Sequence, residues 1–350
     1  MRYDSDSEEN SHKSCAQAGR MVDYNMKAII HGESGLRAGS MPDPEAGSGE
    51  VVVSLRTAGL NRRDLYIPAR RNHKGDDLVL GSDGAGVIEQ VGAEVTGWKV
   101  GDEVLINPSI GWFKNTAASP EGFSPLGMPD DGTFAEKIAI SAEQLEPRPQ
   151  SLSWEESACI GLAGLTGYRA LVTQGRVQKG DTVFLPGAGS GVATFIIQFA
   201  KAKGARVIVT SRSEAKRKAA LRLGADRAID TNADWKEELK DETIDLVIES
   251  VGRATFNRSL DLLKSGGRLV VFGATTEDTV DIDLRSLFNK QQEIIGSMMG
   301  SREELRDMLA FSEQHGVRPV IDEVLPLKEA LEGFKMLEDS SQFGKIVFTI

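Results

Sequence analysis

The chain has 350 residues, of which 40% are hydrophobic and 27% charged, and it carries a formal net charge of −11 with a pI near 5.1. This length allows about two domains, and the negative charge argues against nucleic acid and membrane surfaces as partners. No apolar run reaches membrane-spanning length. Two cysteines, Cys15 and Cys159, cannot form a disulfide framework. Such cysteine usage is typical of a reducing compartment, so we expect a cytoplasmic α/β protein.

The first part of the chain has two patterns. Residues 1–25 are acidic and polar with almost no apolar periodicity, which predicts a disordered tail that is neither a signal nor a transit peptide. From MKAII at Met26 the sequence is rich in short apolar runs separated by glycine turns. This pattern predicts a partly open antiparallel barrel. Its strands are predicted at Val51–Leu55, Val87–Val91, Val104–Ile106 and Thr133–Ile140.

Two segments lead out of this barrel. The insert Asn107–Gly132 is rich in Pro, Ser and Gly, and a loop of that length is usually functional or flexible. Leu152–Gln174 reads as a helix, with Ser153 as its cap and two glutamates in its first turn.

The stretch Thr182–Asp230 predicts a βαβ unit with a glycine-rich turn between the first strand, Val183–Leu185, and the helix Val192–Ala202. Glycines let a backbone approach phosphates closely, and the start of the helix offers free N–H groups. We therefore expect a dinucleotide pyrophosphate at this turn. The candidate residues are Gly187, Gly189, Ser190, Gly191 and Val192.

Strands and helices alternate after residue 150, which predicts a doubly wound parallel sheet. The remaining elements are predicted at Ala205–Thr210, Leu246–Glu249, Thr255–Leu263, Arg268–Gly273, Gln292–Gly296, Arg302–Gln314 and Gly344–Ile350.

From Met26 to Ile350 the chain resembles a medium-chain dehydrogenase/reductase, in particular the zinc-free, quinone-oxidoreductase-like branch. The resemblance is carried by AGLNRRDLY, GSDGAGVIEQVG, GDEV, GTFAEKIAI, GLAGLTGYRAL, ESVG and GKIVF. It implies a GroES-like catalytic domain over residues 26–150, completed by about 310–350, and a Rossmann NADP-binding domain over 151–309. By family habit we expect a homodimer.

The resemblance also bears on metal. Zinc-dependent members bind the catalytic ion through a Cys, a His-Glu pair and a further Cys. Those positions are Asn61, Ser82-Asp83 and Leu162 here, and the insert has no cysteines for a structural zinc lobe. Because zinc needs about three N, S or carboxylate ligands, we expect no metal.

Without a metal, an acceptor must already be electron-poor, which favours quinones and α,β-unsaturated carbonyls. Asn61, Asp64 and Tyr66 match the catalytic pattern of zinc-free members, although Asp64 could simply cap a turn and Tyr66 could simply pack. Arg62 and Arg63 are interpreted as solvated or structural. The alternatives are a zinc-free alcohol dehydrogenase, an enoyl-thioester reductase, and an NADPH-binding protein without turnover.

The cofactor prediction follows from charge. NAD-preferring sites place an acid after the second strand, but here Ser211 and Arg212 follow it, with Lys216 close behind. A guanidinium can hold a 2′-phosphate, so NADPH is predicted. Arg217 and Lys218 are read as a solvated helix face, and Cys159 as a core residue. By resemblance, further cofactor contacts are Thr166, Ser250, Val251, Phe272, Gly273, Ala274, Ser297, Met298, Met299 and Lys345.

Overall fold

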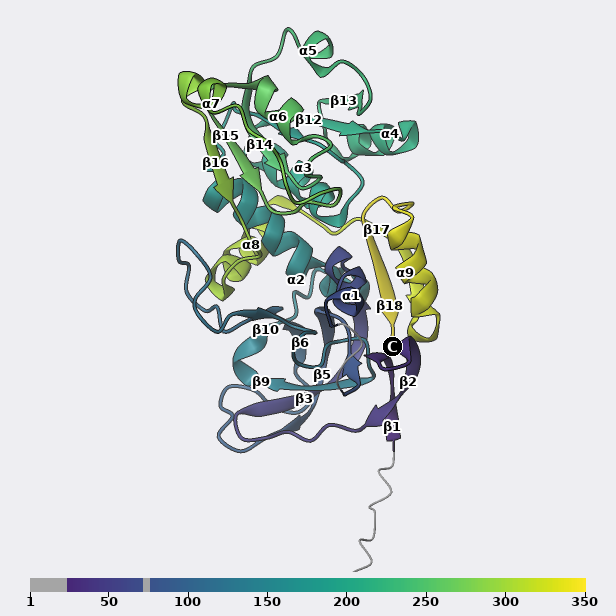
Figure 1. Ribbon diagram of the computed structural model, residues 1–350. Helices are drawn as coiled ribbons and strands as arrows, with labels where there is room; N and C mark the ends of the chain where they lie inside the picture. The colour runs from purple at the N-terminus through teal and green to yellow at the C-terminus, as the bar shows by residue number, and fades with distance from the viewer. Residues whose placement is uncertain (1–23, 72–75) are drawn as a thin grey trace, which may run out of the picture.

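The computed structural model describes residues 24–71 and 76–350, and it arranges them in two lobes joined by one long helix (Figure 1). The tail predicted over residues 1–25 lies outside the described residues, apart from the start of β1. In the part of the chain that is described, no helix has the length and apolar character needed to cross a membrane.

The lower lobe in Figure 1 is a mostly antiparallel barrel of the GroES-like type, as predicted. Its central strand is β3, which pairs with β5, β9 and β18. β18 comes from the far end of the sequence, so the barrel is completed by the last described strands. The barrel strands are β3 (Glu50–Gly59), β5 (Asp83–Val91), β6 (Glu103–Ile106), β9 (Lys137–Ser141), β10 (Leu145–Pro147), β17 (Ile321–Pro326) and β18 (Lys345–Thr349).

Two small sheets flank this barrel. The first contains β1 (Tyr24–Gly32), β2 (Gly35–Pro42) and β4 (Leu78–Val79). The second pairs β7 (Ser109–Ile110) with β8 (Ser124–Pro125) inside the predicted insert. Short helices complete the lobe at α1 (Ile67–Arg71), α9 (Ala330–Glu338) and the 3₁₀ turns Arg62–Leu65, Ala142–Gln144 and Leu327–Glu329.

The upper lobe is a Rossmann fold, which confirms the predicted doubly wound class. Its sheet is wholly parallel with the order β13-β12-β11-β14-β15-β16. The strands are β11 (Thr182–Leu185), β12 (Arg206–Ser211), β13 (Arg227–Asp230), β14 (Ile244–Glu249), β15 (Leu263–Val271) and β16 (Glu293–Gly296). The helices are α3 (Gly191–Ala202), α4 (Glu214–Leu223), α5 (Trp235–Glu238), α6 (Phe256–Leu262), α7 (Leu284–Lys290) and α8 (Arg302–His315).

The joining helix, α2 (Trp154–Tyr168), packs on both lobes. It begins with the predicted cap: the Glu156 amide donates to Ser153 Oγ at 3.2 Å, and the Ser153 amide donates to Glu156 Oε2 at 2.8 Å. Its residues from Ser157 onward are nearly all buried, because strands of one lobe and α3 and α8 of the other cover it.

Several boundaries differ from the prediction. The helix expected over 152–174 stops being α-helical after Tyr168 and continues as a π-helix, Arg169–Gln174. The strand expected at 133–140 is β9, and only an isolated bridge at Ala135 precedes it. β15 starts five residues earlier than expected, at Leu263.

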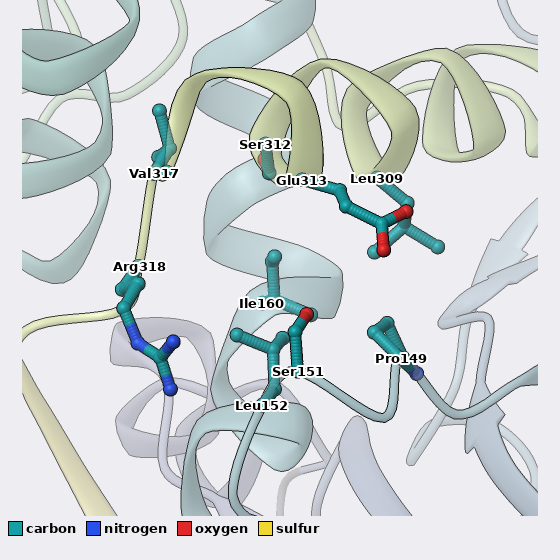
Figure 2. A pocket seen from close by; sticks show the side chains of 10 residues that line it. Pro149, Ser151, Leu152, Ile160, Leu309, Ser312, Glu313, Val317 and Arg318 are labelled. Atoms are coloured by element: carbon teal, nitrogen blue, oxygen red, sulfur yellow. The ribbon is translucent and has the colours of Figure 1, made fainter.

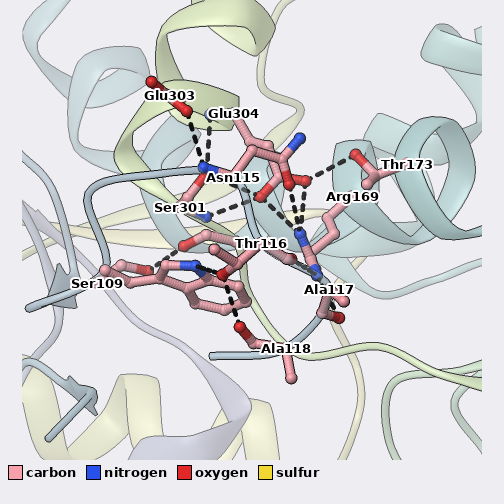
Figure 3. Close-up of polar contacts among 12 residues, drawn as sticks. Ser109, Asn115, Thr116, Ala117, Ala118, Arg169, Thr173, Ser301, Glu303 and Glu304 are labelled. Carbon is pink, nitrogen blue, oxygen red and sulfur yellow. Dashed lines mark hydrogen bonds and ion pairs between the residues drawn. The ribbon is translucent and has the colours of Figure 1, made fainter. Parts of the chain in front are cut away.

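The π-helix presents Arg169 to α8 and to the predicted insert (Figure 3). Arg169 Nη1 donates to Glu304 at 2.7 and 2.8 Å, and both side chains are 1% exposed. Arg169 Nη2 donates to the backbone oxygens of Thr116 and Ala117, and Cζ of the guanidinium lies 4.7 Å from the centroid of the Trp112 ring. The buried ion pair therefore joins the π-helix to α8, and the same guanidinium holds the insert through its backbone oxygens.

Candidate functional site

A pocket of 470 Å³ lies between the lobes, at the carboxyl ends of the Rossmann strands. Ligands of open α/β sheets bind at this place. A smaller pocket of 90 Å³ between α8 and the segment before α2 contains none of the predicted site residues (Figure 2). The predicted residues that line the large pocket are Asn61, Tyr66, Thr166, Ser190, Gly191, Val192, Ser250, Phe272, Gly273, Ala274, Met298, Met299 and Lys345.

The other predicted residues lie outside this lining in the described part of the chain. They are Asp64, Gly187, Gly189, Ser211, Arg212, Lys216, Val251 and Ser297.

The glycine turn connects β11 to α3. Gly187 has φ +79°, a conformation that favours glycine. A Cβ at Gly189 would lie 2.8 Å from Lys216 Cδ, and one at Gly191 would lie 2.6 Å from Lys345 Cδ. Ser190 caps α3 by accepting from the Ala193 amide at 3.1 Å. The first amides of a helix have no partner within it, so this turn offers donors to an anion.

Two hydroxyls of predicted site residues lack a partner among the described residues. Thr166 Oγ1 and Ser297 Oγ are buried without a hydrogen bond, and of the two only Thr166 lines the pocket. Buried polar atoms normally have a partner, so the Thr166 hydroxyl fits a ligand that supplies one. The neighbouring Val251 amide donates at 2.7 Å to Glu249, a buried carboxylate that sequence reasoning missed.

At the end of β12, Arg212 is exposed and free to turn toward a ligand, whereas Ser211 is buried with its Oγ accepting from the Ser213 amide at 3.2 Å. Arg217 is structural and not merely solvated, since it donates to Ser211 O at 2.6 Å and pairs with Asp230 at 3.0 Å.

The Lys216 side chain lies beside Gly189 of the glycine turn and reaches the segment before β18. Its Nζ donates to Ser340 O at 2.6 Å, and Arg62 donates to Ser340 Oγ at 2.6 Å. Burial lowers the pKa of Lys216. This contact connects the Rossmann lobe to the segment before β18, so Lys216 spans the cleft in this structure.

Asp64 is a positioning group and not part of the pocket wall. Its side chain is fully buried, and it accepts from the Asn61 amide at 2.9 Å, which fixes the turn that presents Asn61. Burial raises its pKa to about 7, although the nearby Arg63 opposes this rise. The alternative reading of Asp64 as a turn cap matches this geometry.

Three arginines line the pocket mouth, at positions sequence reasoning had set aside or not considered. Arg63 donates to Leu126 O at 2.6 Å, Arg62 donates to Leu337 O at 3.2 Å, and Arg70 lies 6.0 Å from the ring of Tyr66. Across the described residues, Arg62 and Arg70 form no ion pair with a carboxylate. The mouth therefore carries positive charge that is not neutralised locally.

The positions that hold zinc in other members form a closed polar cluster. Asn61 Nδ2 donates to Asp83 Oδ2 at 2.9 Å, and the Leu162 amide donates to Asp83 Oδ1 at 2.7 Å. Lys345 Nζ enters the same cluster: it donates to Asn61 Oδ1 at 2.5 Å, to Leu60 O at 2.8 Å and to Asp83 Oδ2 at 3.4 Å.

This donor set does not fit a zinc ion. It contains one carboxylate, and an ammonium lies beside it. Over residues 24–71 and 76–350 no group of three or more His, Cys, Asp or Glu side chains is arranged to hold a metal. Cys159, on the adjacent helix, is fully buried, and burial raises the pKa of its thiol to about 12, so it supplies no thiolate at neutral pH.

A GroES-like barrel and a Rossmann lobe with a pocket between them are typical of dinucleotide-dependent oxidoreductases. Residues 47–150 match the alcohol dehydrogenase GroES-like domain family, and residues 191–314 match the zinc-binding dehydrogenase family. The chain belongs to the medium-chain dehydrogenase/reductase (alcohol dehydrogenase) superfamily.

Three similar proteins illustrate the range of this superfamily. An acryloyl-coenzyme A reductase of Sulfurisphaera tokodaii is 31% identical over 92% of this chain and 99% of its own length. The crystal structure of an NAD-dependent alcohol dehydrogenase is 34% identical, with a TM-score of 0.85 over 93% of this chain and 99% of that one. A 2-octenoyl-CoA carboxylase reductase in complex with NADP and 2-octenoyl-CoA is 27% identical, with a TM-score of 0.83 over 93% and 87%.

Proposed function

We propose that this protein is an NADPH-dependent, metal-independent reductase of α,β-unsaturated carbonyl compounds. The observation that carries the proposal is the cluster of Asn61, Asp83 and Lys345, in which Asn61 and Lys345 line the pocket and an ammonium lies in the place of a metal. A site without a Lewis acid suits acceptors whose negative charge spreads over a conjugated system after hydride arrives.

The residues present fit NADPH. The glycine turn and the start of α3 would hold the pyrophosphate, and the Thr166 hydroxyl would find a partner in the bound cofactor. Arg212, exposed at the end of β12, would hold the 2′-phosphate. NADPH supplies a hydride from its nicotinamide, and the structurally similar 2-octenoyl-CoA carboxylase reductase contains NADP.

Among unsaturated carbonyls we favour enoyl-CoA thioesters over quinones. The reason is the charge at the mouth: Arg62 and Arg70 are not paired with carboxylates, and coenzyme A carries phosphates that such guanidiniums bind well. The name of the acryloyl-coenzyme A reductase, 31% identical to this chain, agrees with that choice. Quinones remain the second candidate, because the pocket wall is largely apolar around Leu162 and Phe272.

The test is NADPH oxidation by the purified protein with acryloyl-CoA, crotonyl-CoA, simple enones, quinones and saturated aldehydes. We expect turnover with the enoyl-CoA esters, together with elemental analysis that finds no stoichiometric zinc and activity that survives chelators. Turnover that is lost together with chelated zinc would contradict the metal-free proposal. Tight NADPH binding without oxidation by any acceptor would instead identify a nucleotide-binding protein without turnover.

A homodimer is part of the same proposal. The edge strand β16 and the adjoining α7 expose Leu284, Phe288 and Ile294, which are 68%, 60% and 36% accessible. An apolar edge of a parallel sheet is commonly covered by a partner. Light scattering should give a mass twice that of the chain, and a monomer would contradict this assignment.

A further inference from the structure

Building on the proposed function, we infer that Lys345 is a catalytic residue whose ammonium donates a hydrogen bond to the carbonyl oxygen of the acceptor. In this role it takes over the charge stabilisation that zinc provides in metal-dependent members. Asn61 and Asp83 are then positioning residues, since they act through the ammonium.

The backbone directs Lys345 into the pocket. Lys345 begins β18, where its amide donates to Val320 O at 2.8 Å, and the preceding Gly344 has φ +111° and donates to Gly189 O at 3.1 Å. From there the side chain crosses Gly191, where a Cβ would lie 2.6 Å from Lys345 Cδ. The residue is 3% exposed, and it lines the pocket between the lobes.

The hydrogen bonds of the ammonium leave one N–H weakly engaged. A lysine ammonium has three donors. Two of them meet Asn61 Oδ1 at 2.5 Å and Leu60 O at 2.8 Å. The third lies toward Asp83 Oδ2 at 3.4 Å, beyond the usual range of a strong bond. This third N–H can therefore turn to an acceptor oxygen without losing a short contact.

The cluster also explains how the buried Lys345 side chain can remain charged. A buried ammonium is costly unless a counter-charge lies close to it. Asp83 supplies that charge, and it does not depend on Lys345 for its own hydrogen bonds, because the Leu162 amide and Asn61 Nδ2 already donate to it. Moving the third N–H from Asp83 to a substrate thus leaves no orphaned carboxylate.

When bound, NADPH would supply a hydride to the β-carbon of the enoyl thioester, and the C=C electrons would shift to give the enolate, whose oxygen is negative. The Lys345 N–H donates to that oxygen and keeps its proton. A proton from solvent or from Tyr66 then reaches the α-carbon, so that thioester, NADPH and H⁺ give saturated thioester and NADP⁺. Losing one donor to a developing oxyanion costs about 10²- to 10³-fold in kcat.

The test is Lys345→Met, with Lys335→Met as the matched control because Lys335 is exposed on α9. We expect kcat for crotonyl-CoA to fall by about 10²- to 10³-fold in Lys345→Met, while the Kd for NADPH and the control stay near wild type. A weakened NADPH affinity with unchanged kcat would make Lys345 a cofactor phosphate ligand and overturn the inference.

Chemical rescue separates catalysis from support of the fold. Methylammonium should restore part of the kcat of Lys345→Ala in a saturable way, whereas tetramethylammonium, which has no N–H, should not. Equal effects of the two ions, or none, would overturn the inference. Neither outcome decides the proposed function, which is tested separately on the wild type by its turnover of the acceptors and by its zinc content.

If the Met and Ala variants do not fold, an NMR measurement on the wild-type protein tests the role of Lys345. In protein labelled with ¹⁵N-lysine, the buried ammonium signal, assigned by its absence in Lys345→Arg, should move when butyryl-CoA is added to the NADP⁺ complex. A signal that moves with NADP⁺ and is then insensitive to the thioester would overturn the inference.

Discussion

Replacing Arg169 by methionine should destabilise the protein far more than removing a surface arginine. Arg169 and Glu304 form an ion pair at 2.7 Å in which both side chains are 1% exposed. Breaking such a pair from one side leaves an uncompensated buried charge, which costs about 3–5 kcal/mol. The matched control is Arg253→Met, because Arg253 is half-exposed and lies 3.5 Å from an exposed Glu277; it should cost less than about 1 kcal/mol.

The double variant sharpens this test. Glu304→Gln removes the charge but keeps an acceptor for the Ser301 amide, which donates to Glu304 at 2.9 Å. With Arg169→Met and Glu304→Gln combined, no charge is left buried. We therefore expect the double variant to lose at least about 1 kcal/mol less than the sum of the two single variants. Guanidinium chloride unfolding followed by tryptophan fluorescence gives each free energy of unfolding.

Additive losses would refute the reasoning that the uncompensated charge dominates the cost. A loss in Arg169→Met no larger than in Arg253→Met would refute the claim that the pair matters to stability at all. The same variants report on the insert, because Arg169 also holds the backbone oxygens of Thr116 and Ala117. Proteolysis within residues 112–118 should become faster in Arg169→Met.

Three further predictions concern the site. Arg212→Ala should weaken NADPH binding by about ten- to a hundredfold and leave NADH binding nearly unchanged, which titration of each cofactor measures. An equal loss of affinity for both cofactors would show that Arg212 does not bind the 2′-phosphate. Tyr66→Phe should lower kcat for enones with NADPH affinity unchanged, least for quinones, and an unaltered kcat for every acceptor would leave Tyr66 a packing role. The pKa of Asp64, raised by burial to about 7 from 3.8, means that the folded state binds this proton more tightly than the unfolded state. The contribution of Asp64 to stability is thus full below pH 3.8 and lost as the pH rises through about 7, by at most about 4 kcal/mol. Asp64→Asn should flatten this fall between about pH 4 and about pH 7 in unfolding titrations, and an unchanged slope would contradict it.

The fold class was predictable because both lobes follow strong local patterns. The glycine turn before α3 and the Ser153 cap of α2 are short-range signals, and both appear in the structure as expected. The strand β17 and the helix α9 were missed. β17 has no buried residue and so shows no clear apolar alternation, and the regular pattern of α9 was not recognised in the sequence.

The details of the site were harder to predict because they depend on contacts far apart in the sequence. Lys345 and Asn61 are separated by 284 positions, so no local pattern indicates that their side chains meet. Asp64 could be read from sequence either as a catalytic acid or as a cap, and only its burial and its bond to the Asn61 amide distinguish the two. The position of Lys216 across the cleft likewise depends on Ser340, which lies 124 positions away.

The pairing of β18 with β3 has a consequence for synthesis on the ribosome. Val347–Thr349 cover Thr57–Gly59, so this edge of β3 stays open until residues 347–349 have left the exit tunnel. The Rossmann lobe has all of its strands between residues 182 and 296 and can fold earlier. During synthesis the edge of β3 is therefore exposed, and an exposed strand edge can pair with the wrong strand and is recognised by chaperones.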